Sequence, residues 1–196
     1  LTSTQSVLGV TKTESAEDVV NNLHAELLLA MQLPEKTSVA KRIKILKPII
    51  GASFDFPTIA RIILGESWTP LSSKQRNEFE DTLYRLTVTT YASHFSKFSG
   101  EKFLVSEVKD KKKMTIVDTR LIPSNSSVDV EFISLRYLLV RKNAKWRIIN
   151  VIAQGVSDLA LKRSEYSSVI KKDGFESLIS QLNDKIANLQ QTNRIK

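Results

Sequence analysis

The sequence predicts an α+β domain in which helices precede and follow a bent, four-stranded antiparallel sheet, and three features of the pattern support this fold class. Up to about residue 98, apolar residues recur at steps of three and four, which is typical of amphipathic helices. From about residue 103 to residue 153 they alternate with polar residues, as in half-buried strands. After Gly155 the helical period returns. This order indicates one domain.

Four helices are expected in the first half of the chain. Ser15 and Asp18 form a capping-box pattern before the first helix, and Pro34 ends it. The segment Asp55-Phe56-Pro57 is a start signal, because Asp caps helices and Pro suits the first turn. The other three helices are expected at about 39–49, 58–64 and 72–98.

The four strands are separated by short polar turns. At Phe132–Ile133 the apolar residues change from one parity to the other, which predicts a bulge or a sharp bend. Asp173-Gly174 separates two final helices, expected at about 157–171 and 175–189. The strands themselves are expected at about 103–108, 114–122, 128–139 and 146–153.

The domain is expected to cover residues 14–190, between a flexible lead-in of residues 1–13 and a polar tail of residues 191–196. Because the chain starts at Leu1 and not at Met, we expect that a signal peptide has been removed. No apolar run approaches the ~18 residues that span a bilayer, so a membrane-spanning protein is not expected.

The last predicted strand is apolar on both faces. Trp146 and Ile148 share one parity, whereas Ile149, Val151 and Ala153 share the other. An antiparallel sheet with helices on one side normally has a polar opposite face. Two interpretations follow: either helices cover both faces, or the bent sheet encloses an apolar cavity.

Motifs for catalysis and for metal binding are missing. The chain has no cysteine and only two histidines, His24 and His94, so no metal site is expected. It has no Gly-rich phosphate loop, and Gly155-Val-Ser157 lacks the second glycine of a nucleophile elbow. No pair of carboxylates is placed for acid–base catalysis. We therefore expect neither an enzyme nor a bound cofactor.

Several segments together resemble the MlaC family of periplasmic phospholipid-binding proteins, also called the toluene-tolerance family. They are Phe54-Asp-Phe56 with the later Trp68, the helical stretch 83–91, Trp146-Arg-Ile-Ile-Asn-Val151 and Gly155-Val-Ser-Asp-Leu-Ala160. The resemblance runs from about residue 16 to residue 190. It implies a secreted periplasmic protein whose pocket between bent sheet and helices holds acyl chains.

The resemblance also implies a carrier function and partners. Such a carrier shuttles lipid between the inner and the outer membrane, and its partners are an inner-membrane transporter complex and, for phospholipid carriers, an outer-membrane lipoprotein. At Asp158 and Lys162 the phospholipid carriers tend to have an apolar residue and a Tyr, and these two residues look more like the hopanoid-associated HpnM branch. The cargo is therefore expected to be a phospholipid or a hopanoid-type lipid. The alternative function is an adaptor of a lipid-transport or hopanoid-biosynthesis complex that carries no cargo.

Apolar residues of the predicted helices and sheet are the candidates for the pocket wall: Ile59, Ile63, Leu83, Leu86, Tyr91, Phe103, Val105, Ile116, Val130, Phe132, Tyr137, Trp146, Ile148 and Val151. The formal net charge of +8 favours transient contact with anionic membrane surfaces or acidic partners. Nucleic acid is not expected, because the basic clusters lack neighbouring aromatic residues for stacking. The candidates for docking are Lys41, Lys44, Lys109, Lys111, Lys112 and Lys113.

Overall fold

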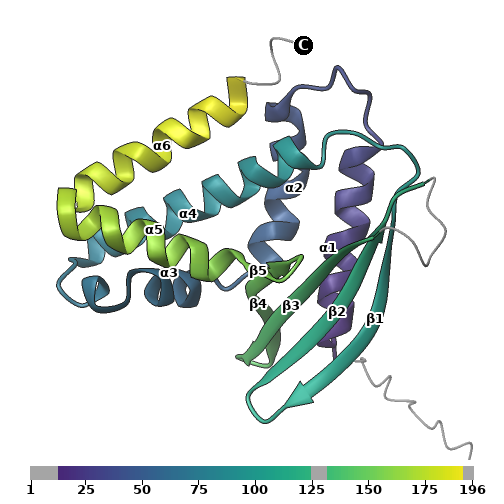
Figure 1. Cartoon of the computed structure of the whole chain (residues 1–196), viewed down its shortest axis with the longest axis horizontal. Coiled ribbons are helices and arrows are strands. Elements are labelled where there is room, and N and C mark those ends of the chain that lie inside the picture. The colour runs from purple at the N-terminus through teal and green to yellow at the C-terminus, as the bar shows by residue number, and fades with distance from the viewer. Residues whose placement is uncertain (1–12, 125–131, 192–196) are drawn as a thin grey trace, which may run out of the picture.

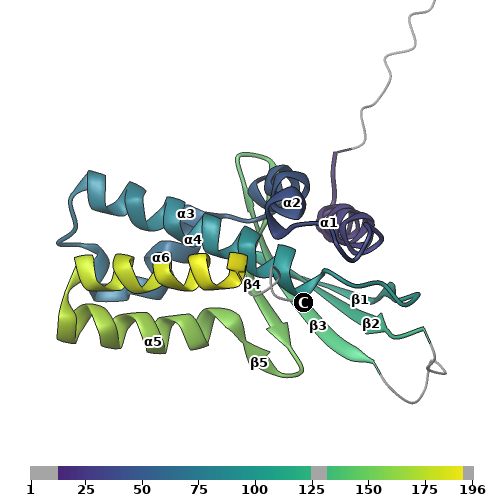
Figure 2. The same cartoon turned by 90° about the horizontal axis from the view of Figure 1, so that it is seen from above.

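The computed structural model describes residues 13–124 and 132–191 of the chain. Within them, helices α1–α4 precede an antiparallel sheet and helices α5 and α6 follow it, as the sequence predicts (Figure 1). Helices α1 and α2 lie against the sheet, and α3 to α6 form a helical layer that extends away from its β4–β5 edge (Figure 2). None of the helices in these two stretches combines the length and hydropathy that crossing a bilayer needs.

Helices α1 (Ala16–Met31) and α2 (Val39–Ser53) form an antiparallel pair. The predicted capping box is present, since the Ser15 side chain accepts from the Asp18 N–H and Asp18 accepts from the Ser15 N–H at 2.8 Å. Helix α2 continues past Pro48 and ends four residues later than predicted. Proline removes one helical N–H, but Ile50 beyond it is completely buried and holds the last turn in place.

Arg42, which lies between basic residues of α2, is buried and not solvent-facing. Its guanidinium donates to the carbonyl oxygen of Ala30 and, at 3.0 Å, to that of Pro34. The C-terminal carbonyls of a helix have no partner within the helix, so Arg42 of α2 satisfies that of Ala30 at the end of α1 and also binds the loop that follows. This residue therefore joins the two helices.

Helix α3 (Phe56–Leu64) begins where the sequence predicts, with Asp55 accepting from the Thr58 N–H at 3.2 Å. A 3-10 turn (Gly65–Trp68) leads to the longest helix, α4 (Ser73–His94). We expected α4 to reach about residue 98, which is wrong. Phe95 leaves the helical conformation, and its ring packs on Tyr91 with centroids 5.6 Å apart.

The sheet has the strand order β1-β2-β3-β4-β5, and every neighbouring pair is antiparallel. The fifth strand was not predicted, because its two residues are too few to show an alternation. The predicted bulge at Phe132–Ile133 lies at the start of β3 and next to residues 125–131, which are outside the described residues. The strands are β1 (Lys102–Lys111), β2 (Met114–Ile122), β3 (Ile133–Lys142), β4 (Lys145–Ala153) and β5 (Val156–Ser157).

A bulge in β4 explains why this strand is apolar at both parities. Leu138 pairs with Asn150 and Leu139 pairs with Ile148, so Ile149 has no partner in β3. An extra residue in one strand shifts the alternation by one position. Ile148 and Val151 consequently lie on the same face of the sheet. This inner face also carries Tyr137, which pairs with Val151.

The outer face of the sheet carries charged as well as apolar residues, and no helix among the described elements covers it (Figures 1 and 2). Arg136 of β3 donates to both carboxylate oxygens of Asp118 in β2, at 2.6 and 3.1 Å. Of the two interpretations of the last strand, helices on both faces of the sheet are therefore not what the structure has. The other interpretation was an apolar cavity enclosed by the bent sheet, and it concerns the inner face.

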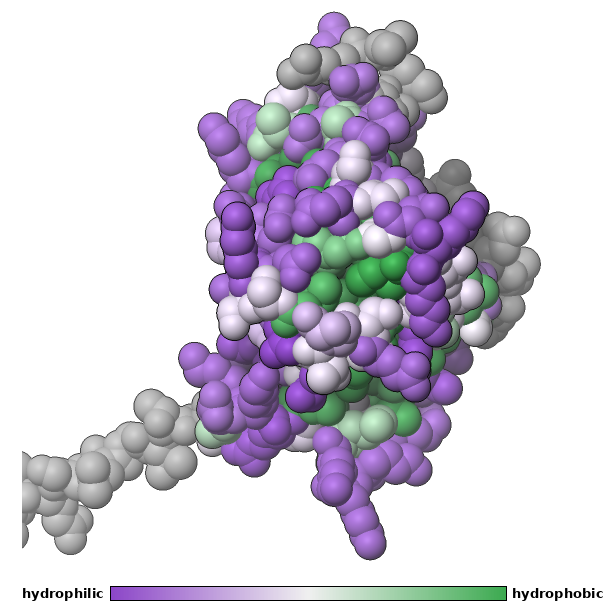
Figure 3. Space-filling view, turned by 90° about the vertical axis from the view of Figure 1, so that its left-hand side faces the viewer, coloured by the Kyte–Doolittle hydropathy of each residue, from purple (hydrophilic) through white to green (hydrophobic). Residues whose placement is uncertain are grey.

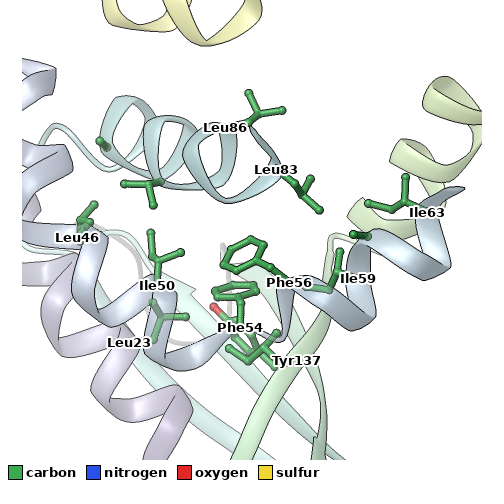
Figure 4. Packing of buried hydrophobic residues seen from close by; sticks show 14 of the residues in the cluster. Leu23, Leu46, Ile50, Phe54, Phe56, Ile59, Ile63, Leu83, Leu86 and Tyr137 are labelled. Carbon is green, nitrogen blue, oxygen red and sulfur yellow. The ribbon is translucent and has the colours of Figure 1, made fainter. Parts of the chain in front are cut away.

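The core lies between the inner face of the sheet and the helices. Leu23 of α1, Ile50 of α2 and Leu86 of α4 are nearly completely buried. Figure 4 shows Phe54 and Phe56, at the passage from α2 to α3, in the middle of this cluster. Phe54 also forms a bridge to Ile148, which attaches the α2–α3 passage to β4.

Helices α5 (Asp158–Asp173) and α6 (Phe175–Gln191) form a hairpin that turns at Gly174. Gly174 has a φ of 86°, a left-handed conformation that glycine adopts without strain. Tyr166 is the buried residue of α5 and meets Phe79 of α4 edge to face, with ring centroids 6.4 Å apart. Helix α6 packs on α4. The hairpin thus forms one wall of the space beside the sheet.

Candidate functional site

A cavity of about 500 Å³ lies between α4, the β3–β5 part of the sheet and the α5–α6 hairpin. This volume falls in the range of sites for small organic ligands, ~300–1,000 Å³. Most of its surface is apolar. The apolar lining comes from Phe54, Phe56, Ile59, Leu83, Leu86, Tyr91, Phe95, Leu135, Tyr137, Ile149, Val151, Ala153, Val156, Leu159, Leu161 and Leu189.

One face of α4 forms a large part of the wall. Leu83, Leu86 and Thr87, and then Thr90 and Tyr91, follow one another at steps of three and four, so they project from the same side of the helix. Inner-face residues of the sheet oppose this side. The β4 bulge contributes here, because it brings Ile149 as well as Val151 to the cavity.

The mouth of the cavity has apolar side chains that are open to solvent. Val156 in β5 is 52% exposed and Leu161 in α5 is 58% exposed, and both line the cavity. Large apolar side chains that stay exposed beside a cavity are typical of sites for an apolar ligand or surface. Figure 3 views the molecule from the end where α5 and α6 join, which is the end of this hairpin away from the mouth, and shows hydrophobic residues in the middle of a hydrophilic frame.

Hydrogen bonds fix the N-terminus of α5 at this mouth. The side-chain oxygen of Asn150 in β4 accepts from the backbone N–H of Leu159 at 3.2 Å, and its amide donates to Ser157 at 3.0 Å. Ser157 in turn caps α5, accepting from the Ala160 N–H at 3.1 Å. The position of α5 relative to the sheet, and therefore the width of the mouth, depends on these bonds.

Three charged side chains also line the mouth. Asp158 and Lys162 lie one turn apart on α5 and form an ion pair. Lys185 reaches the same cavity from α6. The rest of the lining carries hydroxyl, amide and imidazole groups at Thr87, Thr90, His94 and Asn150.

A neutral polar group lies at the floor of the cavity. Tyr137 bonds His24 of α1, with the hydroxyl oxygen 2.9 Å from the imidazole Nε2, and burial lowers the pKa of His24 to about 4. Burial also raises the pKa of the Tyr91 hydroxyl, with a smaller contribution from the charge of Asp158. Both tyrosines therefore stay protonated at neutral pH, and the deep part of the cavity carries no charge.

The structure brings part of the predicted wall together. Among the predicted residues, those that line the cavity are Ile59, Leu83, Leu86, Tyr91, Tyr137 and Val151.

Several other predicted residues are core residues next to the cavity. Ile63 is completely buried in α3, where Ser167 of α5 donates to its carbonyl oxygen at 3.1 Å. Phe103 stacks on His24 with centroids 4.0 Å apart. Val105, Trp146 and Ile148 pack into the same core and are not part of the cavity lining.

Two predicted wall residues lie on the wrong side of the sheet, and one cannot be placed. Ile116 of β2 alternates with the buried Thr115 and Val117, and therefore projects from the outer face. Phe132 lines a second hollow on that outer face, with the guanidinium carbon of Arg120 4.6 Å from its ring centroid. Val130 lies outside the described residues.

Sequence reasoning missed the contribution of the last two helices. Leu159, Leu161 and Leu189 line the cavity, although we expected its walls only in the sheet and the earlier helices. The sequence position of Leu161 could have indicated this contribution. Leu161 lies outside the apolar stripe that Leu159, Tyr166 and Val169 form along α5, so its side chain was free to contact something other than the core.

The predicted docking lysines lie on two separate elements. Lys41 and Lys44 are exposed on α2, and the exposed residues 111–113 form the β1–β2 turn. Lys109 instead lies along β1, with its Nζ 2.6 Å from a carboxylate oxygen of Glu107.

Fold and cavity together define a small α+β domain built around an apolar binding pocket. The family model of the MlaC protein matches residues 21–184, so this chain belongs to the MlaC family. The resemblance inferred from the sequence is thereby confirmed at the level of the family, while closeness to the hopanoid-associated branch stays a prediction.

Two similar proteins agree with this family. The chain is 21% identical over 122 residues to the intermembrane phospholipid transport system binding protein MlaC of Haemophilus influenzae, and the match covers 61% of this chain and 56% of that protein. The solved structure of a phospholipid-binding protein from Ralstonia solanacearum, in complex with a phospholipid, matches with a TM-score of 0.77. It is 17% identical and the match covers 89% of this chain and 98% of that chain, which shows that the fold is shared.

Proposed function

We propose that this chain is a periplasmic lipid carrier that shuttles a phospholipid or hopanoid-type lipid between the inner and the outer membrane. The observation that carries the proposal is the apolar cavity with its exposed apolar mouth, in a chain of the MlaC family. The names of the two similar proteins support a phospholipid as cargo. Support for a hopanoid comes from Asp158 and Lys162 alone.

Transfer energetics determine how such a carrier works. Each buried methylene contributes ~0.8 kcal/mol, so a chain of ~14 carbons contributes on the order of 10 kcal/mol. A lipid held this firmly does not dissociate into water at a useful rate. It has to pass directly to another apolar site, which is why we include an inner-membrane transporter complex and an outer-membrane lipoprotein as partners in the proposal.

The lining favours binding over catalysis. The deep cavity walls are aliphatic and aromatic, and burial raises the pKa of both tyrosine hydroxyls that reach them. A general acid or base needs a pKa near the working pH, which a buried neutral tyrosine does not have. We therefore propose a carrier and not an enzyme.

Native mass spectrometry of the protein purified from a bacterial periplasm tests the proposal. We expect a species heavier than the chain by one lipid, and solvent extraction followed by lipid analysis should identify a phospholipid or a hopanoid. A chain of unmodified mass, which also takes up no labelled lipid from vesicles, would contradict the carrier function. That outcome would favour the adaptor.

A further inference from the structure

The mouth of the cavity brings two lysines together from different helices. Helices α5 and α6 run antiparallel and turn at Gly174, and Lys162 and Lys185 lie at nearly equal separations along the chain from this turn. They are therefore at the same level of the hairpin. Both line the cavity.

The charges at the mouth do not balance. The side chain of Lys162 is 19% exposed and pairs with Asp158, which is 61% exposed. Lys185 takes part in none of the ion pairs found within residues 13–124 and 132–191. With two ammonium groups and one carboxylate, the mouth carries one positive charge in excess.

Under the proposed carrier function, a bound lipid has its headgroup at this level. Its chains occupy the apolar interior, and the exposed Val156 and Leu161 mark where the chains leave it. A headgroup there approaches the lysines of α5 and α6. A phosphodiester with a net negative charge neutralises the excess positive charge, whereas a zwitterionic headgroup brings an additional ammonium group beside two existing ones.

We propose that Lys162 and Lys185 make this pocket select lipids with a net-anionic headgroup over lipids with a zwitterionic headgroup and the same chains. The inference rests on the proposed carrier function. Because exposed ion pairs contribute little and salt screens them, the preference is modest, roughly two- to fivefold.

A competition between two phospholipids with identical acyl chains measures this preference. Purified protein is equilibrated with vesicles that contain equal amounts of phosphatidylglycerol and phosphatidylethanolamine, separated from them, and extracted for mass spectrometry. The wild-type protein should hold the two lipids in a ratio of about two to five in favour of phosphatidylglycerol. Because both lipids come from the same vesicle, attraction of the protein to the vesicle surface does not bias the ratio.

Substitutions test whether the lysines at the mouth cause the preference for the anionic lipid. The double substitution Lys162→Gln/Lys185→Gln should bring the ratio to about one. Lys171→Gln/Lys172→Gln is the matched control, since it removes the same charge from exposed positions in the last turn of α5. Asp158→Asn should raise the ratio above that of the wild type, because it releases Lys162 from its ion pair.

The outcomes separate the inference from the carrier function. Lipid bound by the wild type in the same ratio as in the vesicles would overturn the inference and leave the carrier function standing. A control variant that loses the preference as fully as Lys162→Gln/Lys185→Gln would also overturn it, because net charge and not the mouth would then decide. A wild-type protein that binds neither lipid would overturn the inference together with the proposal that the carrier takes up phospholipid.

Discussion

At the scale of single residues, His24 couples the floor of the cavity to the stability of the fold. It is buried between Phe103 and Tyr137, and burial lowers its pKa from 6.5 to about 4. In the unfolded chain the imidazole takes up a proton near pH 6.5, while in the folded protein it stays neutral down to about pH 4. The contribution of neutral His24 to the free energy of unfolding is therefore complete above pH 6.5 and is lost as the pH falls toward 4.

We predict that the free energy of unfolding decreases by up to about 3 kcal/mol between pH 6.5 and pH 4 because of this residue. His24→Gln keeps a polar group that can bond Tyr137 but does not titrate, so it should remove this part of the pH dependence. Urea unfolding at pH 7 and at pH 5 measures the difference. Equal pH dependence of variant and wild type would show that the histidine is not buried in its neutral form.

At the scale of single elements, helix α5 separates a cavity wall from a core. Leu161 at the mouth is 58% exposed, whereas Ile63 of α3, on the other side of α5, is completely buried. A polar group is tolerated at the first position and costs several kcal/mol at the second, because a buried amide without a partner keeps its desolvation penalty.

Two matched substitutions should therefore differ in their effects on stability and on lipid retention. Leu161→Gln should leave the free energy of unfolding within about 0.5 kcal/mol of the wild type and reduce the amount of lipid that the protein retains. Ile63→Gln should destabilise the fold by about 3 kcal/mol. Thermal unfolding and lipid extraction are measured on both variants. If Leu161→Gln retained lipid like the wild type, this helix would not border the binding site.

The elements themselves were largely predictable from the sequence. Caps at Ser15 and Asp55 predicted where helices begin, since each offers a side-chain oxygen to an N–H of the first turn. The end of α4 was not predictable, because its apolar pattern continues to Phe98 and the packing of Phe95 on Phe103 of β1, with ring centroids 6.2 Å apart, is a tertiary contact.

The candidate site was predictable only in part, for a similar reason. The sequence shows apolar residues at both parities of β4, but only the pairing of Leu138 with Asn150 and of Leu139 with Ile148 shows that a bulge turns Ile148 and Val151 to one face. Periodicity does not tell the two faces of a sheet apart, which is why Ile116 was assigned to the cavity and lies on the outer face. The contribution of Leu161 depends on how the α5–α6 hairpin packs beside the sheet.

At the scale of the whole molecule, the antiparallel topology brings basic residues from different parts of the chain to one end of the sheet. The β1–β2 and β3–β4 turns lie at the same end, so residues 111–113 are near Lys145. The cavity mouth lies beyond the opposite end of β4, next to β5. We propose that residues 111–113 help to dock the loaded carrier on acidic acceptor surfaces.

Charge reversal tests this docking. Lys112→Glu/Lys113→Glu should slow lipid transfer to anionic acceptor vesicles at least about fivefold, since each lysine near such a surface contributes roughly 1 kcal/mol. Retention of lipid should not change. Lys171→Glu/Lys172→Glu makes the same change in net charge at exposed positions in α5 and serves as the control. An unchanged rate of lipid transfer would show that this turn does not dock the carrier, and Lys41 and Lys44 on α2 would then be the remaining candidates.

Photocrosslinking tests most directly whether the cavity holds the lipid chain. The protein is loaded with a phospholipid that carries a diazirine near the end of one acyl chain, irradiated and digested. We predict labelled peptides from the stretches 83–95 of α4 and 149–153 of β4, whose side chains line the cavity. Labels concentrated instead around Arg120 and Phe132, in the hollow on the outer face of the sheet, would contradict the assignment of the binding site.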